Sequence, residues 1–187
     1  YASFTELQDC AQKDNNPFLM AMVGKVYKKG KIVIRNLEKA IQYFARSAEL
    51  ECPLGYYYIG KEYYYGRYLE QNYTKAKRFL LLAIKGNTEP RAGFYLYKIS
   101  KFRPDLEIDG IEMLKIGALF GHKKALFKLG SLLYQGLLID RNKDVAIKLI
   151  RQASFQDYQK AKNFCILHGI SMKKNRNKKI QLKSKQT

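Results

Sequence analysis

The sequence holds 187 residues, with 35 lysine and arginine residues against 16 aspartate and glutamate residues and a formal net charge of +19 at pH 7. Hydrophobic residues make up 47% of the chain and only four prolines occur, so the composition excludes an intrinsically disordered protein and argues against a turn-rich β protein. The three widely spaced cysteines, Cys10, Cys52 and Cys165, argue against a disulfide framework and favour a reducing compartment such as the cytoplasm.

The positive charge is spread over the whole chain. Residues 173–187 hold seven lysines and arginines and no acidic residue, and subtracting 7 from 19 leaves +12 on residues 1–172. A basic body favours an acidic partner, which is nucleic acid, an anionic membrane surface or an acidic face of another protein. No apolar stretch reaches the roughly 18 residues that a membrane helix needs. The chain begins at Tyr1 without a methionine, so we expect a processed form or a piece of a longer protein.

Apolar residues recur with the period of a helix along the chain. Leu37, Ile41, Phe44 and Ala48, for example, follow one another at intervals of three or four residues, which places them on one helix face. In chain order, the predicted helices cover residues 2–13, 17–29, 37–50, 54–65, 73–86, 90–102, 107–120, 123–135, 143–154 and 158–169.

Two glycines six positions apart mark the first helix of three units. The pairs are Gly24 with Gly30, Gly60 with Gly66, and Gly130 with Gly136. We expect the first glycine of each pair to let two helices pack closely, because a glycine inside a helix otherwise costs about 1 kcal/mol relative to alanine. We expect the second glycine to end its helix in the left-handed conformation.

A small residue marks the second helix of every unit, including one unit that lacks the glycine pair. These lead positions step by 36, 34 and 36 residues along the chain, and they are Ala40, Ala76, Gly110 and Ala146. An asparagine, which is a favoured helix N-cap, stands four residues before three of them, at Asn36, Asn72 and Asn142. The unit at 90–120 is therefore present but shortened by two residues. It has Tyr97 and Arg103 in the glycine positions, and Pro104 and Asp105 replace the connection.

A single helical hairpin cannot bury its apolar stripe alone, so neighbouring hairpins are expected to stack. The spacing predicts an all-α chain of tandem helix–turn–helix repeats of about 36 residues. Residues 1–169 are expected to form about four full repeats with a half repeat at each end. Residues 170–187 are expected to form a basic, disordered tail.

The segments 23–30, 36–44 and 47–48 resemble the Sel-one-like repeat (SLR) family, a relative of the tetratricopeptide repeat. The segments around Gly60 with Ala76 and around Gly130 with Ala146 follow the same pattern, and the resemblance covers about residues 2–169. It implies a right-handed α-α superhelix, or solenoid, whose concave face binds other proteins. It thereby implies a scaffold or adaptor that is not an enzyme.

Tyrosines crowd into the second unit and are the leading candidates for a binding surface. By helical phase Tyr56 and Tyr63 are expected on the core side, whereas the others are expected to point partly away from it and to lie beside Lys61 and Arg67. The others are Tyr57, Tyr58, Tyr64 and Tyr65. Exposed tyrosines beside basic residues favour a binding patch. The alternative is that these rings pack between adjacent units.

Lysines at comparable positions of the first helices are expected to form a basic stripe along the concave face. They are Lys25 and Lys28, together with Lys29, in one unit and Lys98 and Lys101 two units later. The alternative is an ordinary solvated helix surface. We expect a protein partner with an acidic segment. Nucleic acid is the alternative partner, and membrane contact is expected only through the basic tail.

The sequence shows no convincing catalytic set, metal site or cofactor motif. His122 and His168 are isolated, no zinc-ligand spacing occurs, and the glycine pairs lack the lysine and hydroxyl residue of a phosphate loop. Cys165 and His168 lie close in sequence, but we expect Cys165 to be a core residue rather than a nucleophile.

Overall fold

A computed structural model describes residues 3–85 and 88–172 of the chain, and within these ranges it is entirely helical. The helices are α1 (Phe4–Lys13), α2 (Pro17–Lys29), α3 (Leu37–Glu49), α4 (Pro53–Tyr65), α5 (Tyr73–Ile84), α6 (Arg91–Phe102), α7 (Gly110–Leu119), α8 (Lys123–Gln135), α9 (Lys143–Phe155) and α10 (Gln159–Leu167). Each predicted helix is present and its ends lie within three residues of the predicted ones. Of the predicted tail at 170–187, the part from residue 173 onward lies outside the described residues.

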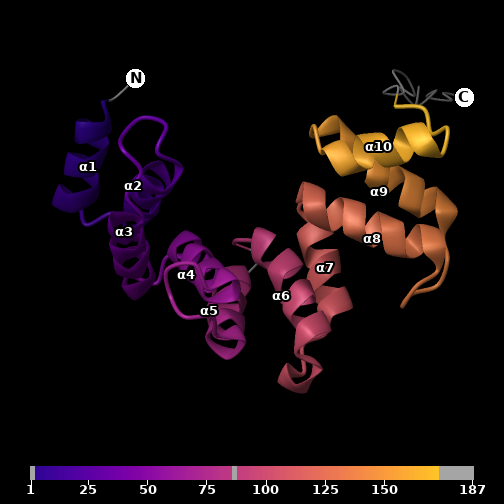
Figure 1. Ribbon diagram of the computed structural model, residues 1–187, viewed down its shortest axis with the longest axis horizontal. Coiled ribbons are helices and arrows are strands. Elements are labelled where there is room, and N and C mark those ends of the chain that lie inside the picture. The colour runs from indigo at the N-terminus through magenta and orange to yellow at the C-terminus, as the bar shows by residue number, and fades with distance from the viewer. Residues whose placement is uncertain (1–2, 86–87, 173–187) are drawn as a thin grey trace, which may run out of the picture.

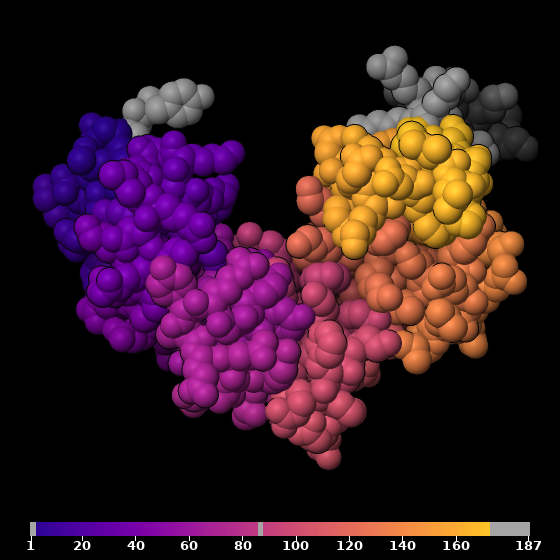
Figure 2. Space-filling model, in the orientation of Figure 1, coloured from indigo at the N-terminus to yellow at the C-terminus, as the bar shows by residue number. Residues whose placement is uncertain are grey.

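The helices pack as four hairpins, α2 with α3, α4 with α5, α6 with α7, and α8 with α9. Each hairpin also contacts the next through its second helix and the first helix that follows, so the units stack in chain order. The stack curves into an arch whose two ends rise on either side of a central hollow (Figure 1; Figure 2). The prediction of a solenoid of helical repeats is confirmed.

The predicted helix ends are confirmed by their backbone geometry. Gly30, Gly66 and Gly136 end α2, α4 and α8 with φ angles of 62°, 65° and 73°, in the left-handed region that glycine tolerates. The second helices begin with side-chain caps. The amide oxygen of Asn36, Asn72 or Asn142 accepts a hydrogen bond from the backbone N–H three residues later.

The first glycine of each pair lies where two helices cross at close range. A Cβ added to Gly24 would lie 2.7 Å from the ring of Phe44, and one added to Gly60 would lie 2.8 Å from the side chain of Leu80. Gly130 has the same relation to Ile150, at 2.7 Å. These distances are shorter than van der Waals contact, so the absence of a side chain is what allows each hairpin to close.

The short unit reaches the same packing by other means. The helix predicted at 107–120 begins only at Gly110, because Pro104–Leu106 form a 3₁₀ turn and Asp109 caps the helix. The close approach is made by Gly93, whose added Cβ would lie 2.2 Å from the backbone oxygen of Met113 on α7. Tyr97, which stands in the glycine position, is buried in the core between the units.

Candidate protein-binding surface

The first helices of the units form a continuous row. α2 contacts α4, α4 contacts α6 and α6 contacts α8. Charges two units apart also influence one another across this row. The pKa of Lys25 on α2 is lowered by burial and by Lys29, and also by Arg91 on α6. Side chains two units apart approach each other only on the concave side of a curved row. We call this side, formed by α2, α4, α6 and α8, the inner face.

Three of the four tyrosines predicted to point away from the core are buried. Tyr57, Tyr58 and Tyr64 are 5%, 6% and 6% exposed, and only Tyr65 is half-buried. The expectation that these rings are exposed was therefore wrong for three of them. The reason is that α4 is covered from several sides, by α3, α5, α2 and α6, so rings away from its main apolar face are also enclosed.

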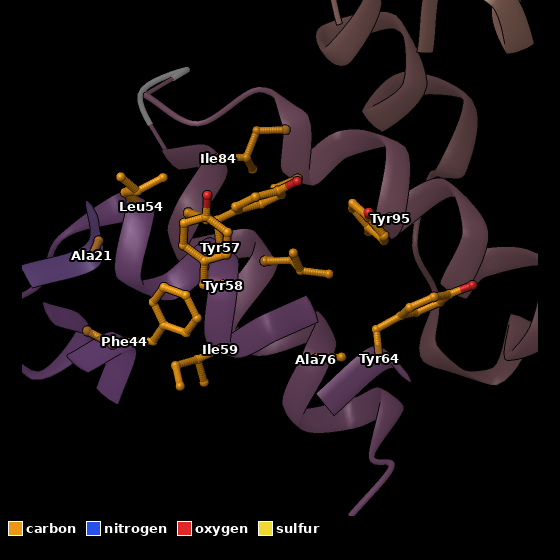
Figure 3. Close-up of a cluster of buried hydrophobic side chains, with 14 of the residues drawn as sticks. Ala21, Phe44, Leu54, Tyr57, Tyr58, Ile59, Tyr64, Ala76, Ile84 and Tyr95 are labelled. Carbon is orange, nitrogen blue, oxygen red and sulfur yellow. The ribbon is translucent and has the colours of Figure 1, made fainter. Parts of the chain in front are cut away.

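The buried rings connect one unit to the next. Tyr58 stacks on Phe44 of α3 with ring centroids 4.3 Å apart, whereas Tyr57 and Tyr64 approach Tyr95 of α6 edge-on at 6.0 and 5.5 Å (Figure 3). The hydroxyl oxygens of Tyr65 and Tyr95 are 3.5 Å apart. Packing between units, the alternative weighed above, is therefore the role that the structure gives to these tyrosines.

Tyr56 and Tyr63, expected on the core side, are half-buried and lie over Phe79 of α5. The ring of Tyr63 stacks on that of Phe79 with centroids 5.7 Å apart. These two rings therefore close the α4–α5 hairpin rather than the contact between units.

Lysine side chains of the inner face lie over this aromatic layer. The ammonium of Lys61 is 5.0, 5.7 and 5.3 Å from the ring centroids of Tyr57, Tyr58 and Tyr95. That of Lys98 is 5.3 Å from the ring of Tyr64. Such cation–π contacts hold a lysine in place without neutralising its charge. The tyrosines therefore position the cations of the inner face even though they are not themselves exposed.

The carboxylates of the inner face are already engaged. Glu62 is 3% exposed and forms an ion pair with Lys28. Glu89 is 7% exposed and forms a bidentate ion pair with the guanidinium of Arg91. Among the ion pairs of the described residues, none includes Lys25, Lys61 or Lys98. These three lysines are therefore half-buried charged groups that form no ion pair within the described part of the chain.

Burial and neighbouring positive charges shift pKa values at this site. Burial and the neighbouring Lys28 lower the pKa of Lys61 to about 8, and Lys124 and Arg91 add to the effect, whereas Glu62 opposes it. Burial, Lys124, Arg91 and Lys61 lower the pKa of His122, at the start of α8, to about 4. Cationic side chains from α4, α6 and α8, namely Lys61, Arg91 and Lys124, therefore converge on the inner face beside His122, which stays neutral at pH 7.

A cleft of about 350 Å³ opens next to these cations, between α2, α4 and α6. Its walls include the apolar side chains of Phe18, Met22 and Leu54, and Lys25 and Arg91 provide positive charge. An extended segment of a partner would find both apolar surface and charge there.

The structure brings together most of the residues predicted for the basic stripe. Lys25, Lys28, Lys61 and Lys98 lie half-buried on the inner face. Lys101 is exposed at the end of α6, where it helps to lower the pKa of Lys128 on α8. The structure adds four residues that sequence reasoning missed, namely Glu89, Arg91, His122 and Lys124. These four residues lie just before or at the start of α6 and α8. Their sequence positions could have indicated the site, because residues at the start of a first helix lie on the row of first helices.

No group of three potential metal ligands occurs among residues 3–85 and 88–172. Cys165 is buried, as expected for a core residue, and Cys10 is exposed. Across the same ranges, no helix has the length and apolar character to span a membrane.

Comparison with known proteins agrees with the repeat pattern. The model of the Sel1 repeat matches residues 17–52, 53–87 and 123–158, together more than half of the chain. The three ranges correspond to the hairpins α2–α3, α4–α5 and α8–α9, and the unmatched hairpin is the short unit. No curated protein matches the chain.

Several solved structures share the fold. One is c5321, a protective antigen present in uropathogenic Escherichia coli strains and displaying an SLR fold, with a TM-score of 0.68 and 21% identity. Two others are a Sel1 repeat protein from Oxalobacter formigenes, with a TM-score of 0.70 and 17% identity, and the immunity protein Pa5087 from Pseudomonas aeruginosa, with a TM-score of 0.60 and 19% identity. In the same order, the matches cover 89%, 85% and 84% of this chain and 36%, 66% and 59% of the chains in those structures. The chain therefore spans only part of each of these proteins.

Proposed function

Because the chain belongs to the Sel1 repeat family, we propose that it is a protein-binding scaffold that holds an acidic segment of a partner along its inner face. Sel1 repeat proteins generally mediate protein–protein interaction, and their repeat fold is a non-catalytic scaffold. The specific proposal concerns the face that is used and the chemistry of the segment that occupies it.

The observation that carries the proposal is the environment of Lys61. Its ammonium is partly buried, lies among other cations and has no carboxylate in ion-pair distance within the described ranges. Burying a charge without a partner is unfavourable, so a carboxylate supplied by another protein would bind strongly there. Lys25 and Lys98 offer the same opportunity on either side.

The second helices of the units differ in this respect. Arg46 pairs with Glu49 on α3, and Lys115 pairs with Glu112 on α7, both at exposed positions. Lys75 and Arg78 of α5 form no ion pair in the described residues, but both are exposed to solvent. Lys25, Lys61 and Lys98, in contrast, are half-buried. This difference in burial supports the inner face as the binding surface.

The same observations favour protein over nucleic acid as the partner. Sequence-independent binding of single strands relies on bases that stack on accessible aromatic faces. The rings beneath the inner-face lysines are buried, since Tyr57, Tyr58, Tyr64 and Tyr95 are 4–6% exposed. At Lys61 and Lys98 a base would therefore find no exposed ring face beneath the ammonium groups, whereas a carboxylate needs only the ammonium groups themselves.

A binding experiment with matched variants tests this proposal. A fluorescently labelled glutamate-rich peptide and a labelled single-stranded RNA of equal charge are titrated with the chain at about 50 mM salt. The double variant Lys61→Met with Lys98→Met is compared with Lys85→Met with Lys148→Met, which removes the same charge from exposed positions just after α5 and on α9. The proposal expects peptide binding to fall by at least about tenfold only in the first variant.

Two results would contradict it. If both double variants lose the same affinity, the peptide is attracted by net charge and not by the inner face. If the RNA binds tightly and the first variant abolishes that binding while the peptide does not bind, the inner face is a nucleic-acid site.

A further inference from the structure

Three lysines that form no ion pair in the described residues occupy the same position in three successive units. Lys25 and Lys61 directly follow Gly24 and Gly60, and Lys98 directly follows Tyr97, which holds the glycine position of the short unit. They lie on α2, α4 and α6, which contact one another in that order. Because the position is equivalent, the three side chains form a ladder, which we call the lysine ladder, with one step per unit.

The step of the lysine ladder follows from helix packing. Axes of helices in contact lie about 8–10 Å apart, so the lysines recur at roughly that interval along the row. A polyproline II segment rises about 3.1 Å per residue and completes a turn in three residues. Side chains three apart on such a segment therefore face the same way at intervals of about 9 Å. A β-strand differs, because its side chains share a face every second residue, at roughly 6.6–6.8 Å.

From this match we infer that the partner segment is an extended, polyproline II-like stretch with an acidic residue at every third position. This inference rests on the proposed function and specifies its ligand. The segment crosses α2, α4 and α6, and each of its carboxylates meets one of Lys25, Lys61 and Lys98. The rings beneath Lys61 and Lys98 hold the ammonium groups in place, which reduces the entropy lost on binding.

Two seven-residue peptides of identical composition separate spacing from charge. The first is Glu-Pro-Pro-Glu-Pro-Pro-Glu, and the second is Pro-Glu-Pro-Glu-Pro-Glu-Pro, which has the same charge with its glutamates two apart. Both carry a fluorophore, and binding to the full chain is measured by anisotropy. We expect the first peptide to bind about tenfold more tightly, and we expect Lys61→Met to remove most of that difference. Lys148→Met, on the exposed side of α9, leaves it unchanged.

The outcomes distinguish this inference from the proposed function. If the two peptides bind with equal affinity and Lys61→Met weakens both, the inferred three-residue spacing of acidic residues is wrong. The inner face then remains a site for an acidic segment. Failure of both peptides to bind overturns the spacing and the proposed function together.

A gain-of-binding variant provides an independent test. Ser131 follows Gly130 on α8, so it occupies the next step of the lysine ladder without a charge. Ser131→Lys is expected to strengthen binding of a ten-residue peptide with four glutamates spaced three apart by about fivefold, and to leave the seven-residue peptide unchanged. An equal gain for both peptides, or none for the longer one, contradicts the assigned step.

Discussion

At the scale of single residues, Lys61 carries a cost in stability that the proposed binding of a carboxylate would offset. Its ammonium lies over the rings of Tyr57, Tyr58 and Tyr95, and nearby cations together with burial lower its pKa. A group of this kind destabilises the unbound protein, although the ring contacts offset part of the cost. The same desolvation strengthens its attraction for an incoming carboxylate.

Replacing Lys61 with methionine is therefore expected to stabilise the chain by roughly 1–3 kcal/mol at pH 7. The folded pKa of about 8 lies below the ordinary 10.5, so at pH 7 the lysine is charged in both states and the full penalty is present. As the pH rises from 8 towards 10.5, the folded state loses its proton first and the penalty is relieved. Urea unfolding of both proteins at pH 7 and 9.5 should show the stabilisation shrinking by more than half. A constant difference would exclude this explanation.

Glycines of two kinds offer a second test at this scale. The Cβ of a Gly60→Ala variant would meet the movable side chain of Leu80, whereas that of a Gly93→Ala variant would meet the backbone oxygen of Met113 at 2.2 Å. A backbone atom cannot yield without moving a helix. We expect Gly93→Ala to lower the free energy of unfolding by about 2–3 kcal/mol and Gly60→Ala by less. Gln152→Ala, at an exposed position of α9, should change it by under about 0.5 kcal/mol. The reverse order of the two glycines would contradict this account.

The sequence predicts a residue's role well when that role depends on neighbours within the same repeat, and poorly when it depends on neighbouring repeats. The roles of Gly24 and Gly60 follow from recurrence at one phase, and the structure confirms them. The burial of Tyr57, Tyr58 and Tyr64 does not follow from helical phase, because it depends on neighbours from preceding and following units. The burial of a side chain between stacked units depends on the curvature of the solenoid. The sequence of a single repeat does not determine that curvature.

At the scale of elements, the asparagine caps set where the second helices begin. Asn72, for instance, caps α5 through its side chain, and its backbone N–H donates to the oxygen of Tyr63 on α4, 3.0 Å away. The cap therefore also fixes the loop between the two helices. The same arrangement recurs at Asn36 and Asn142, so the sequence signal was sufficient to predict these helix starts.

Removing this cap gives a prediction for the element. Asn72→Ala should lower the free energy of unfolding by about 1 kcal/mol, because the N–H of Lys75 loses its acceptor. Asn72→Asp keeps an acceptor at the same place and should restore most of the stability. Chemical denaturation followed by circular dichroism compares the three proteins. Equal loss in both variants would mean that the side chain acts through something other than the cap.

The short unit shows the limit of prediction at this scale. Its second helix begins at Gly110 rather than near residue 107, because the 3₁₀ turn Pro104–Leu106 and the cap at Asp109 take up the preceding residues. The landmark glycines are absent there, and Gly93 provides the close approach from a different turn of α6. Where a repeat lacks the landmark residues, other residues provide the close helix packing. The repeat pattern does not predict which residues these are.

At the scale of the whole molecule, the stacking of the units brings charges that are distant in the sequence together on the face proposed to bind the partner. The net charge of +19 is a property of the sequence, but the convergence of Lys61, Arg91 and Lys124 results from the stacking of α4, α6 and α8. Lys61 and Lys124 influence each other although a complete hairpin separates their helices in the chain. A hollow between the two arms of the arch leaves room for a partner segment (Figure 2).

The most direct measurement of the central claim is a map of where an acidic segment binds. Titrating the ¹⁵N-labelled chain with Glu-Pro-Pro-Glu-Pro-Pro-Glu and following backbone amide shifts locates the contact without any substitution. The largest shifts are expected on α2, α4 and α6, around Lys25, Lys61 and Lys98. Shifts concentrated on α3, α5, α7 or α9, or spread evenly over all exposed lysines, would contradict the inner face as the binding surface.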